Sequence, residues 1–261
     1  MHASWLFVVP LLALAAVTAG AQSSTPAPGA GRFVPREVKV GHERHKFLVW
    51  LPPGHDAGRH WPAILFLHGS GESGTDGERP TWVGLGPALK AHPEQWPYVV
   101  VFPQKPTDQE EWEERESLAL AALDDAVRTF GVDAGRVALM GMSQGGHGAW
   151  LIGARHPERW RCLVPICGYG RPHCIVGRIA ELPVWAFHGL RDDVVDPRET
   201  EATIAQTQDV RRQRGLDPAT ARLTLFPEAN HNAWDPAIAH DSLHVWLAEW
   251  LAPRTNTGGS R

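Results

Sequence analysis

The sequence is poor in cysteine. It has three cysteines among 261 residues, which allow at most one disulfide, and none has the spacing of a zinc site. Cys167 and Cys174 bracket a loop that contains glycine and proline, so they are the expected pair in an oxidising compartment. Cys162 lies in an apolar run and is expected to be a buried small hydrophobe. The histidines of residues 42–45 (HERH) lack H-E-x-x-H spacing, and no metal site is expected.

A strong charge of one sign is also lacking. The formal net charge is −4 at pH 7, which provides no electrostatic basis for binding nucleic acid or an anionic membrane. The content of 43% apolar and 21% charged residues is ordinary for a soluble globular protein, and 261 residues fit a single domain. Tryptophan, with 12 copies, is the abundant aromatic residue. Many of these tryptophans must lie in the core, although an aromatic-lined substrate groove is compatible with the count.

Long hydrophobic runs are absent except near the N-terminus. Leu6–Val17 is apolar but interrupted by Pro10, and it is too short for a comfortable membrane span. Ala19-Gly20-Ala21 has the small-x-small form of a signal-peptidase site, so residues 1–21 are expected to be a cleaved signal peptide. The protein is therefore expected to be secreted or periplasmic, without stable membrane association after cleavage near Ala21. Because no Lys or Arg precedes the run, a retained N-terminal anchor is the alternative.

Two segments of polar and small residues mark the limits of the folded part. Residues 22–32 are rich in Ser, Pro, Ala and Gly and are expected to be a flexible linker. Residues 253–261 (PRTNTGGSR) are expected to be a disordered tail. Residues 33–252 are therefore expected to form one folded domain.

Short apolar runs separated by helical patterns fill this domain. Val34–Val40 and Lys46–Leu51 flank Gly41-His42 and predict an antiparallel hairpin. The later runs are nearly all apolar, as is typical of parallel strands with helices on both faces. They are Ala63–Leu67, Tyr98–Phe102, Val137–Met140, Cys162–Ile166, Val184–Phe187 and Leu223–Phe226. This order predicts an α/β fold with a mostly parallel, doubly wound sheet and an N-terminal antiparallel hairpin.

Helix boundaries are marked at three places. Apolar residues recur at helical spacing from Leu120 to Phe130, and Gly131 provides a C-terminal stop. Asp196-Pro197 predicts the start of another helix, with Asp as the N-cap and Pro at the first helical position. Asp235-Pro236 repeats this pattern and predicts the start of the final helix.

The strongest local motif is Gly141-Met142-Ser143-Gln144-Gly145, which matches G-x-S-x-G. A strained turn from strand to helix needs glycines at its flanks, because side chains there would collide with the chain. The preceding residues 137–140 have the pattern of a buried strand, and residues 146–155 can be helical. Ser143 is therefore the candidate nucleophile, and a glycine–serine turn without chemistry is the alternative.

An acyl-transfer site also needs hydrogen-bond donors for an oxyanion. One donor is expected to be the backbone N–H of Gln144, the residue after the nucleophile. The second is expected from the loop after Ala63–Leu67, where glycines let the backbone approach a substrate closely. We assign it to the N–H of Ser70, with Gly71 as the alternative. His68 is expected to order this loop rather than to act as a base.

The acid and the base of a triad built on this motif follow the serine in that order. Of three candidate acids, Asp196 already caps a helix, and Asp192 lies nearer to the end of the preceding strand than Asp193. Asp192 is therefore preferred, and Asp193 remains the alternative. Among 14 histidines, His231 follows the last predicted strand in a short loop and is the candidate base. Its ring would take the serine proton and return it to the leaving alcohol, while the aspartate fixes its tautomer.

Several motifs together resemble one known family. They are LHGSGESGTDG (67–77), RVALMGMSQGGHGAW (136–150), PICGYG (165–170), VWAFHGLRDDVVDP (184–197) and FPEANHNAWDPA (226–237). The chain resembles bacterial α/β-hydrolases labelled predicted peptidases or esterases, which are related to feruloyl and acetylxylan esterases and to polyhydroxybutyrate depolymerases. The resemblance implies the α/β-hydrolase fold and the triad of Ser143, Asp192 and His231. It also implies that Trp112 and Trp234 line the acyl site, with core packing as their alternative role.

These features predict hydrolysis of carboxylic esters through an acyl-enzyme, without a cofactor. Only a short polar connection lies between Tyr169 and Leu182, so no large lid is expected. An open cleft favours small short-acyl or aromatic esters, free or linked to a polysaccharide. Acyl transfer to an alcohol or sugar acceptor uses the same intermediate and is one alternative. A non-catalytic, esterase-like binding module is the other, and the complete set of triad residues disfavours it.

Overall fold

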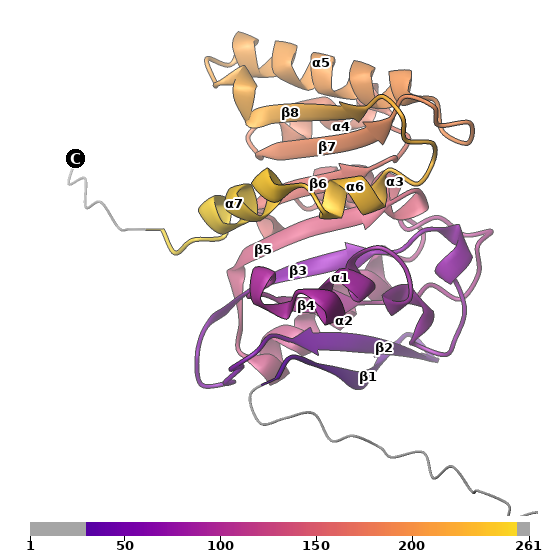
Figure 1. Cartoon of the computed structure of the whole chain (residues 1–261), viewed down its shortest axis with the longest axis vertical. Helices are drawn as coiled ribbons and strands as arrows, with labels where there is room; N and C mark the ends of the chain where they lie inside the picture. Colours follow the sequence, from indigo (N-terminus) through magenta and orange to yellow (C-terminus); the bar gives the residue numbers. More distant parts are fainter. Residues whose placement is uncertain (1–29, 255–261) are drawn as a thin grey trace, which may run out of the picture.

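A sheet of eight strands runs through the middle of the molecule (Figure 1). The structure is a computed structural model, which describes residues 30–254. The predicted signal peptide, most of the predicted linker and the end of the predicted tail lie outside the described residues. The strands are β1 (Arg32–Val40), β2 (Glu43–Leu51), β3 (Trp61–Leu67), β4 (Val99–Phe102), β5 (Val132–Met142), β6 (Cys162–Ile166), β7 (Val184–Gly189) and β8 (Ala221–Phe226).

The order of the strands confirms the predicted α/β class. Across the sheet it is β1-β2-β4-β3-β5-β6-β7-β8. The hairpin β1–β2 is antiparallel and joins β4 in antiparallel register, and every neighbouring pair from β4 to β8 is parallel. Each strand expected from the sequence is present, with shifts at some of the ends. The carboxyl ends of the parallel strands therefore meet at one edge of the sheet.

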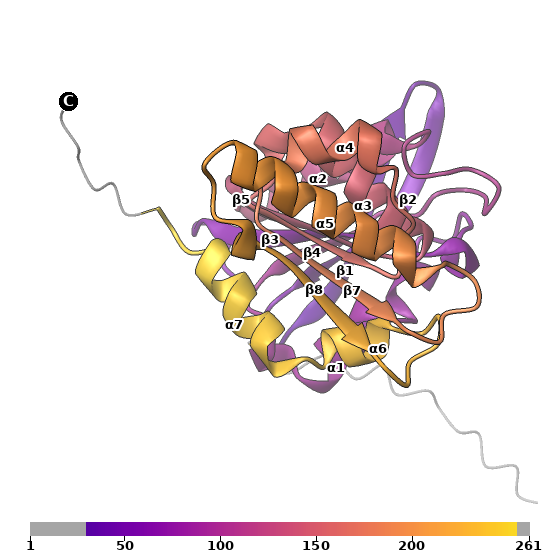
Figure 2. The same cartoon turned by 90° about the horizontal axis from the view of Figure 1, so that it is seen from above.

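Helices cover both faces of the sheet (Figure 2). The helices are α1 (Leu85–Ala91), α2 (Glu116–Phe130), α3 (Gln144–Arg155), α4 (Pro172–Ile179), α5 (Pro197–Gln213), α6 (Trp234–Ile238) and α7 (Asp241–Trp250). Helices α2 to α5 pack on one face, and α1, α6 and α7 pack on the other. Strand β3 shows why its sequence is apolar throughout: Leu65 faces the first layer, and its neighbours Ile64 and Phe66 face the second.

Two predicted helix boundaries are confirmed. Helix α2 ends at Gly131, which adopts the left-handed conformation with φ +65°, where glycine has no steric penalty. Helix α5 begins after Asp196, whose side chain accepts a hydrogen bond from the backbone N–H of Arg198 at 3.0 Å.

The prediction for the C-terminal helix is wrong in two respects. Two helices, α6 and α7, replace the single helix and meet at Ala239-His240. The Asp235-Pro236 pair lies inside α6 rather than before it. The N-cap is Ala233, and the preceding Asn232 accepts a hydrogen bond from the N–H of Asp235, in the first turn, at 3.3 Å.

The connection between Tyr169 and Leu182 is more ordered than expected. It contains helix α4, whose Ile175 and Ile179 are buried in the core. Helix α4 packs against α3 and α5, and it does not reach over the cavity beside Ser143. Within residues 30–254, no helix combines the length and the apolar character needed to cross a membrane.

The expected disulfide is not formed. Cys167 and Cys174 are both free thiols, and they lie in different surroundings. Cys167 is fully buried directly after β6, in the core layer that contains α6 and α7. Cys174 is exposed on α4, on the opposite side of the sheet. The spacing in the sequence did not reveal this separation. The expectation for Cys162, a buried small hydrophobe, is confirmed.

Candidate active site

Ser143 lies at a tight turn between β5 and α3. Its φ is +55°, a conformation that costs energy for any residue with a side chain. The turn is held by hydrogen bonds from the Ser143 N–H to Ile166 O at 2.9 Å and from the His147 N–H to Ser143 O at 3.0 Å. A Cβ on Gly141 would overlap the backbone of Gly145. The glycines of the G-x-S-x-G motif are therefore required by the closeness of the backbone.

His231 lies between Ser143 and Asp192. Its Nε2 is 2.9 Å from Ser143 Oγ, and its Nδ1 is 2.8 Å from Asp192 Oδ2. Because the carboxylate can only accept, Nδ1 carries the proton, and Nε2 accepts from the serine hydroxyl. The three side chains follow β5, β7 and β8, whose carboxyl ends lie at the same edge of the parallel sheet (Figure 1). The residues named from the sequence are thus brought into hydrogen-bond contact.

Asp192 is the acid that reaches His231, whereas Asp193 is exposed. The Asp192 side chain has 0% exposure. Burial by itself raises the pKa of this carboxyl group. Hydrogen bonds from the N–H of Val195, from His231 and from the N–H of Val194 outweigh burial and hold the pKa below its usual value. Asp192 therefore remains an anion beside the imidazole at neutral pH.

His188 also contacts Asp192, and the sequence analysis did not single it out. Its Nε2 lies 3.0 Å from Asp192 Oδ2, and its side chain has 0% exposure. Its Nδ1 lies 2.8 Å from Thr200 Oγ1, on the first turn of α5. The available signal was His188-Gly189, polar and small residues at the end of an apolar strand. A histidine at such a position more often packs in the core, so the pattern was not decisive.

The predicted oxyanion donors lie beside the serine. Ser70 is the first residue of a short 3-10 helix, Ser70–Glu72, and Gln144 is the first residue of α3. Both line one cavity together with Ser143. Within the described part of the chain, the backbone N–H of neither residue donates a hydrogen bond. The first N–H groups of a helix lack partners inside the helix, so both are available to an anion.

Two side chains, the partly buried Glu72 and the fully buried His68, hold the loop that carries Ser70. Glu72 Oε2 accepts from the N–H of Gly69 at 3.1 Å. His68 accepts from the N–H of Lys105 at its Nε2, at 3.1 Å, and its Nδ1 contacts Gly69 O. Burial lowers the pKa of His68 to about 3, so the ring is neutral at ordinary pH. His68 has the structural role expected for it, with both ring nitrogens bound to backbone.

The two predicted tryptophans have different places. Trp112 has 0% exposure, and its indole N–H donates to His68 O at 2.9 Å, so its assignment to the acyl site is wrong. Trp112 also contacts the His68 ring edge to face, with the centroids 4.9 Å apart, and so supports the start of the loop that carries Ser70. Trp234 is partly exposed and lies edge-on to the His231 ring, with the centroids 5.6 Å apart. Trp234 therefore borders the site beside the base.

A match to a family model shows the family to which the chain belongs. The model called Esterase, described as "Putative esterase", matches residues 39–216, which is more than half of the chain. The chain belongs to this esterase family. The family and the strand order confirm the expected α/β-hydrolase fold. No curated protein matches the chain.

Solved structures of hydrolases are similar to this esterase-family chain. A thermostable esterase has a TM-score of 0.70 and 23% identity over 83% of this chain, which spans only 62% of that one. An S-formylglutathione hydrolase from Agrobacterium tumefaciens has a TM-score of 0.63 and 18% identity, over 87% of this chain and 98% of that one. A feruloyl esterase module from Clostridium thermocellum, complexed with sinapinate, has a TM-score of 0.60 and 17% identity, over 87% and 89%. At these identities the likeness shows a shared fold.

The cavity of this esterase-family chain has a volume of about 370 Å³ and lies beside Ser143. Besides the serine and the oxyanion donors, it is lined by Tyr169, Val194, Val195, Asp196 and Glu199. Tyr169, Val194 and Glu199 were not among the site residues predicted from the sequence. Tyr169 and Val194 come from the loops after β6 and β7, and Glu199 lies on the first turn of α5; these segments approach the serine only in the folded sheet. The wall combines apolar and acidic side chains.

Among residues 30–254, two clusters bring potential metal ligands within 4.8 Å of one another. One consists of Cys167, Asp192 and His231, where burial raises the pKa of the Cys167 thiol to about 12. The second is Glu111, Glu113 and His147. Tyr169 donates to Glu111, and the Nδ1 of His147 lies 2.8 Å from the carbonyl oxygen of Tyr169. These bonds attach the second cluster to the loop that lines the cavity.

Proposed function

We propose that the protein is a serine hydrolase that cleaves carboxylic esters through an acyl-enzyme on Ser143. The observation that carries the proposal is the position of His231, 2.9 Å from Ser143 Oγ and 2.8 Å from Asp192 Oδ2. At these two hydrogen-bond distances, a general base can take the proton of a hydroxyl while a carboxylate orients the base. Membership of the esterase family supports the same reaction class.

The reaction proceeds in two halves. His231 Nε2 takes the Ser143 proton while Oγ bonds to the ester carbonyl carbon, and the N–H groups of Ser70 and Gln144 stabilise the oxyanion. The imidazolium, paired with anionic Asp192, then gives its proton to the leaving alcohol as the C–O bond breaks. Water, deprotonated by His231, attacks the acyl-enzyme in the same way. The acid leaves, and Oγ recovers its proton.

The cavity supports small substrates. A volume of about 370 Å³ admits a short acyl chain or one aromatic ring, with the alcohol side toward solvent. The proposed substrates are short-acyl or aromatic esters, free or attached to a polysaccharide. The likeness to a feruloyl esterase module crystallised with sinapinate supports the aromatic class. Transfer of the acyl group to an alcohol or sugar is the second candidate, because such acceptors attack the same intermediate.

A substrate series with matched variants tests the proposal. Hydrolysis of p-nitrophenyl acetate, butyrate and octanoate and of methyl ferulate is measured for the wild type, Ser143→Ala and Ser117→Ala, which changes an exposed serine of α2. We expect Ser143→Ala to lose essentially all turnover and Ser117→Ala to retain it. A wild type inert on every ester would favour the binding module. Transesterified product formed with added alcohol would favour the transferase.

The proposal includes export. Residues 1–21 are the proposed signal peptide, with cleavage near Ala21. Mass spectrometry of the protein recovered from the medium or the periplasm should give a mature chain that starts close to Gln22. A full-length chain retained in the membrane fraction would support the N-terminal anchor instead.

A further inference from the structure

We propose that His188 is a positioning residue for this reaction: its neutral imidazole, protonated at Nε2, donates to Asp192 and fixes the carboxylate against His231. The inference rests on the proposed function of Ser143, His231 and Asp192. It adds a fourth side chain that acts only through the acid, and Thr200 as the residue that sets its tautomer.

The carboxylate of Asp192 has donors on both oxygens. Oδ1 accepts from the N–H groups of Val194 and Val195, both at 2.9 Å. Oδ2 lies 2.8 Å from His231 Nδ1 and 3.0 Å from His188 Nε2. The ring of His231 is 17% exposed, whereas His188 is fully buried. His188 is therefore the side-chain partner that contacts Oδ2 from the buried side of the site.

The surroundings of His188 determine where its proton lies. Nε2 faces two acceptors, Asp192 Oδ2 at 3.0 Å and the carbonyl oxygen of Val195 at 3.1 Å. A lone pair at Nε2 would be repelled by both, so Nε2 must carry a proton. Nδ1 faces the hydroxyl of Thr200 at 2.8 Å, which can donate to it. The Nε2–H form thus satisfies both ring nitrogens without adding a charge.

A doubly protonated ring is the competing arrangement. In that form Nδ1 would donate to Thr200, whose hydroxyl would donate to Gly168 O at 3.1 Å. The charged groups around His188 are Asp192, His231 and Asp196, and Asp196 is paired with Arg198. Burial lowers the pKa of His188 and outweighs the opposite effect of Asp192. The ring is therefore neutral at neutral pH, and the full negative charge of Asp192 remains available to His231.

This arrangement has two consequences for catalysis. Without the His188 donor, Oδ2 would be held by His231 alone, and the carboxylate and the imidazole would shift together away from Ser143. Asp192 would also become more basic, since it would lose a hydrogen bond that favours its anion. A more basic partner stabilises the imidazolium, so the acid limb of the pH–rate profile would move to higher pH.

Variants of the two residues separate positioning from packing. His188→Phe keeps a ring and removes the donor, and His188→Gln keeps an N–H group near the place of Nε2. Thr200→Val removes the hydroxyl at nearly constant volume. The matched control is Thr207→Val on the same helix: Thr207 is also fully buried, but its hydroxyl donates to Thr203 O at 2.7 Å.

For p-nitrophenyl butyrate, the measured quantities are kcat, KM and the acid limb of the pH–rate profile. The rate at which a fluorophosphonate labels Ser143 is measured as well. We expect His188→Phe to lower kcat and the labelling rate about 10- to 100-fold, the loss typical of one hydrogen bond to a charged group, at nearly constant KM. His188→Gln should recover part of the loss. Thr200→Val should show a smaller loss, and Thr207→Val should match the wild type.

Unchanged kcat and an unchanged acid limb in folded His188→Phe would overturn the proposal. If that variant does not fold, Thr200→Val decides, since equal rates for it and Thr207→Val would overturn the role of the hydroxyl. Nitrogen NMR of the labelled wild type gives a test that needs no activity. A His188 protonated at Nδ1 at neutral pH contradicts the proposal. Absence of fluorophosphonate labelling in the wild type would instead refute the proposed function.

Discussion

At the scale of single residues, the site depends on charges that burial would otherwise suppress. A carboxylate without exposed surface stays ionised only if donors replace the water it has lost. Asp192 has such donors on both oxygens, whereas the adjacent Asp193 lies in solvent. Two neighbouring residues of the same type thus have entirely different chemical properties.

Replacement of each aspartate measures this difference. Asp192→Asn removes the anion and places an amide against His231, which favours the wrong tautomer of the ring. We expect kcat for p-nitrophenyl butyrate to fall on the order of 10³- to 10⁴-fold, as the same change does in the Ser-His-Asp triad of a serine protease. Asp193→Asn, the matched control, should change it less than about 2-fold, as expected for an exposed side chain. A larger loss in Asp193→Asn would reverse the assignment.

His68 leads to a prediction for stability against pH. Its pKa is lowered by burial to about 3, whereas a histidine in the unfolded chain titrates near pH 6.5. Below about pH 6.5 only the unfolded state takes up the proton, so the free energy of unfolding decreases by up to about 1.4 kcal/mol per pH unit until about pH 3. Above pH 6.5 the contribution is complete. Burial lowers the pKa of His188 too, which acts in the same direction.

Urea unfolding at about pH 7, 6 and 5 measures this slope. We expect His68→Gln to be less stable than the wild type at pH 7 but to lose less stability on acidification. His42→Gln changes an exposed histidine and should keep the slope of the wild type. Equal slopes for all three proteins would show that His68 takes up its proton in the folded state.

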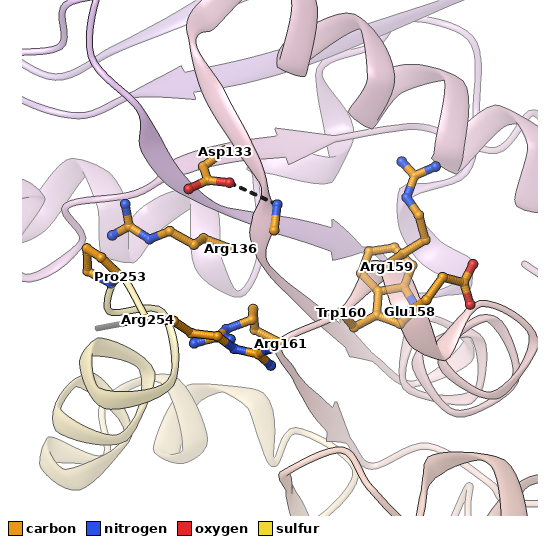
Figure 3. Close-up of a pocket in the computed structure, with 9 residues that line it drawn as sticks. Asp133, Arg136, Glu158, Arg159, Trp160, Arg161, Pro253 and Arg254 are labelled. Carbon is orange, nitrogen blue, oxygen red and sulfur yellow. Dashed lines mark hydrogen bonds between the residues drawn. The ribbon is translucent and has the colours of Figure 1, made fainter. Parts of the chain in front are cut away.

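At the scale of elements, the C-terminal end of helix α7 is bound by arginines at the edge of the sheet that lies opposite to the candidate active site. Arg136 Nε donates to Leu251 O at 2.7 Å, and Arg161 Nε donates to Trp250 O at 3.0 Å. Figure 3 shows these side chains and Arg254 gathered at the end of the described chain. The guanidinium groups satisfy carbonyls that a helix end leaves without partners, and they oppose its partial negative charge.

Removal of one guanidinium should loosen this helix. We expect Arg161→Ala to lower the free energy of unfolding by about 1–2 kcal/mol, the value of a charge-assisted hydrogen bond at a helix end. Burial lowers the pKa of Arg161, with Arg254 and Arg136 adding to the effect, and relief of this repulsion keeps the loss moderate. Chemical denaturation measures it. Arg178→Ala, on the exposed side of α4, should show no loss, and an equal loss there would contradict the interpretation.

The elements also show where sequence patterns succeed. Strands β3 to β7 are mostly buried, so nearly all-apolar runs identified them from the sequence. The edge strand β8 was found from a similar run, although only its Ala221 is buried. Helix α4 was missed because it is only eight residues long and contains Pro172 and Gly177, and its two buried isoleucines pack where the helix meets α3 and α5. The break between α6 and α7 was missed for a similar reason, since tertiary packing outweighs a local capping pattern.

At the scale of the whole molecule, the sheet separates residues that are close in the chain. Cys167 and Cys174 are seven positions apart, but the first is buried on one side of the sheet and the second is exposed on the other. Burial raises the pKa of Cys167 to about 12 and also raises that of Cys162. Reactivity toward thiol reagents therefore reports the fold.

Thiol titration tests this arrangement. We expect one equivalent of thiol, Cys174, to react in the native protein and three equivalents to react after unfolding without reductant. Cys174→Ser should abolish the native reaction, whereas Cys162→Ser should leave it unchanged. A single thiol detected after unfolding would show that a disulfide forms after all.

The sequence by itself determined the class of the fold, the turn at Ser143, and the order of serine, acid and base. These features are local or periodic: glycines at a crowded turn, apolar runs of strand length, and polar residues directly after them. Only the tertiary structure shows that Asp192, and not Asp193, contacts His231, and that Trp112 lies in the core. It also shows that Cys167 and Cys174 lie apart, and that His188 contacts both Asp192 and Thr200. Each of these depends on the direction of a side chain relative to distant segments. That direction is set when helices pack on both faces of the sheet and its strand ends meet at one edge.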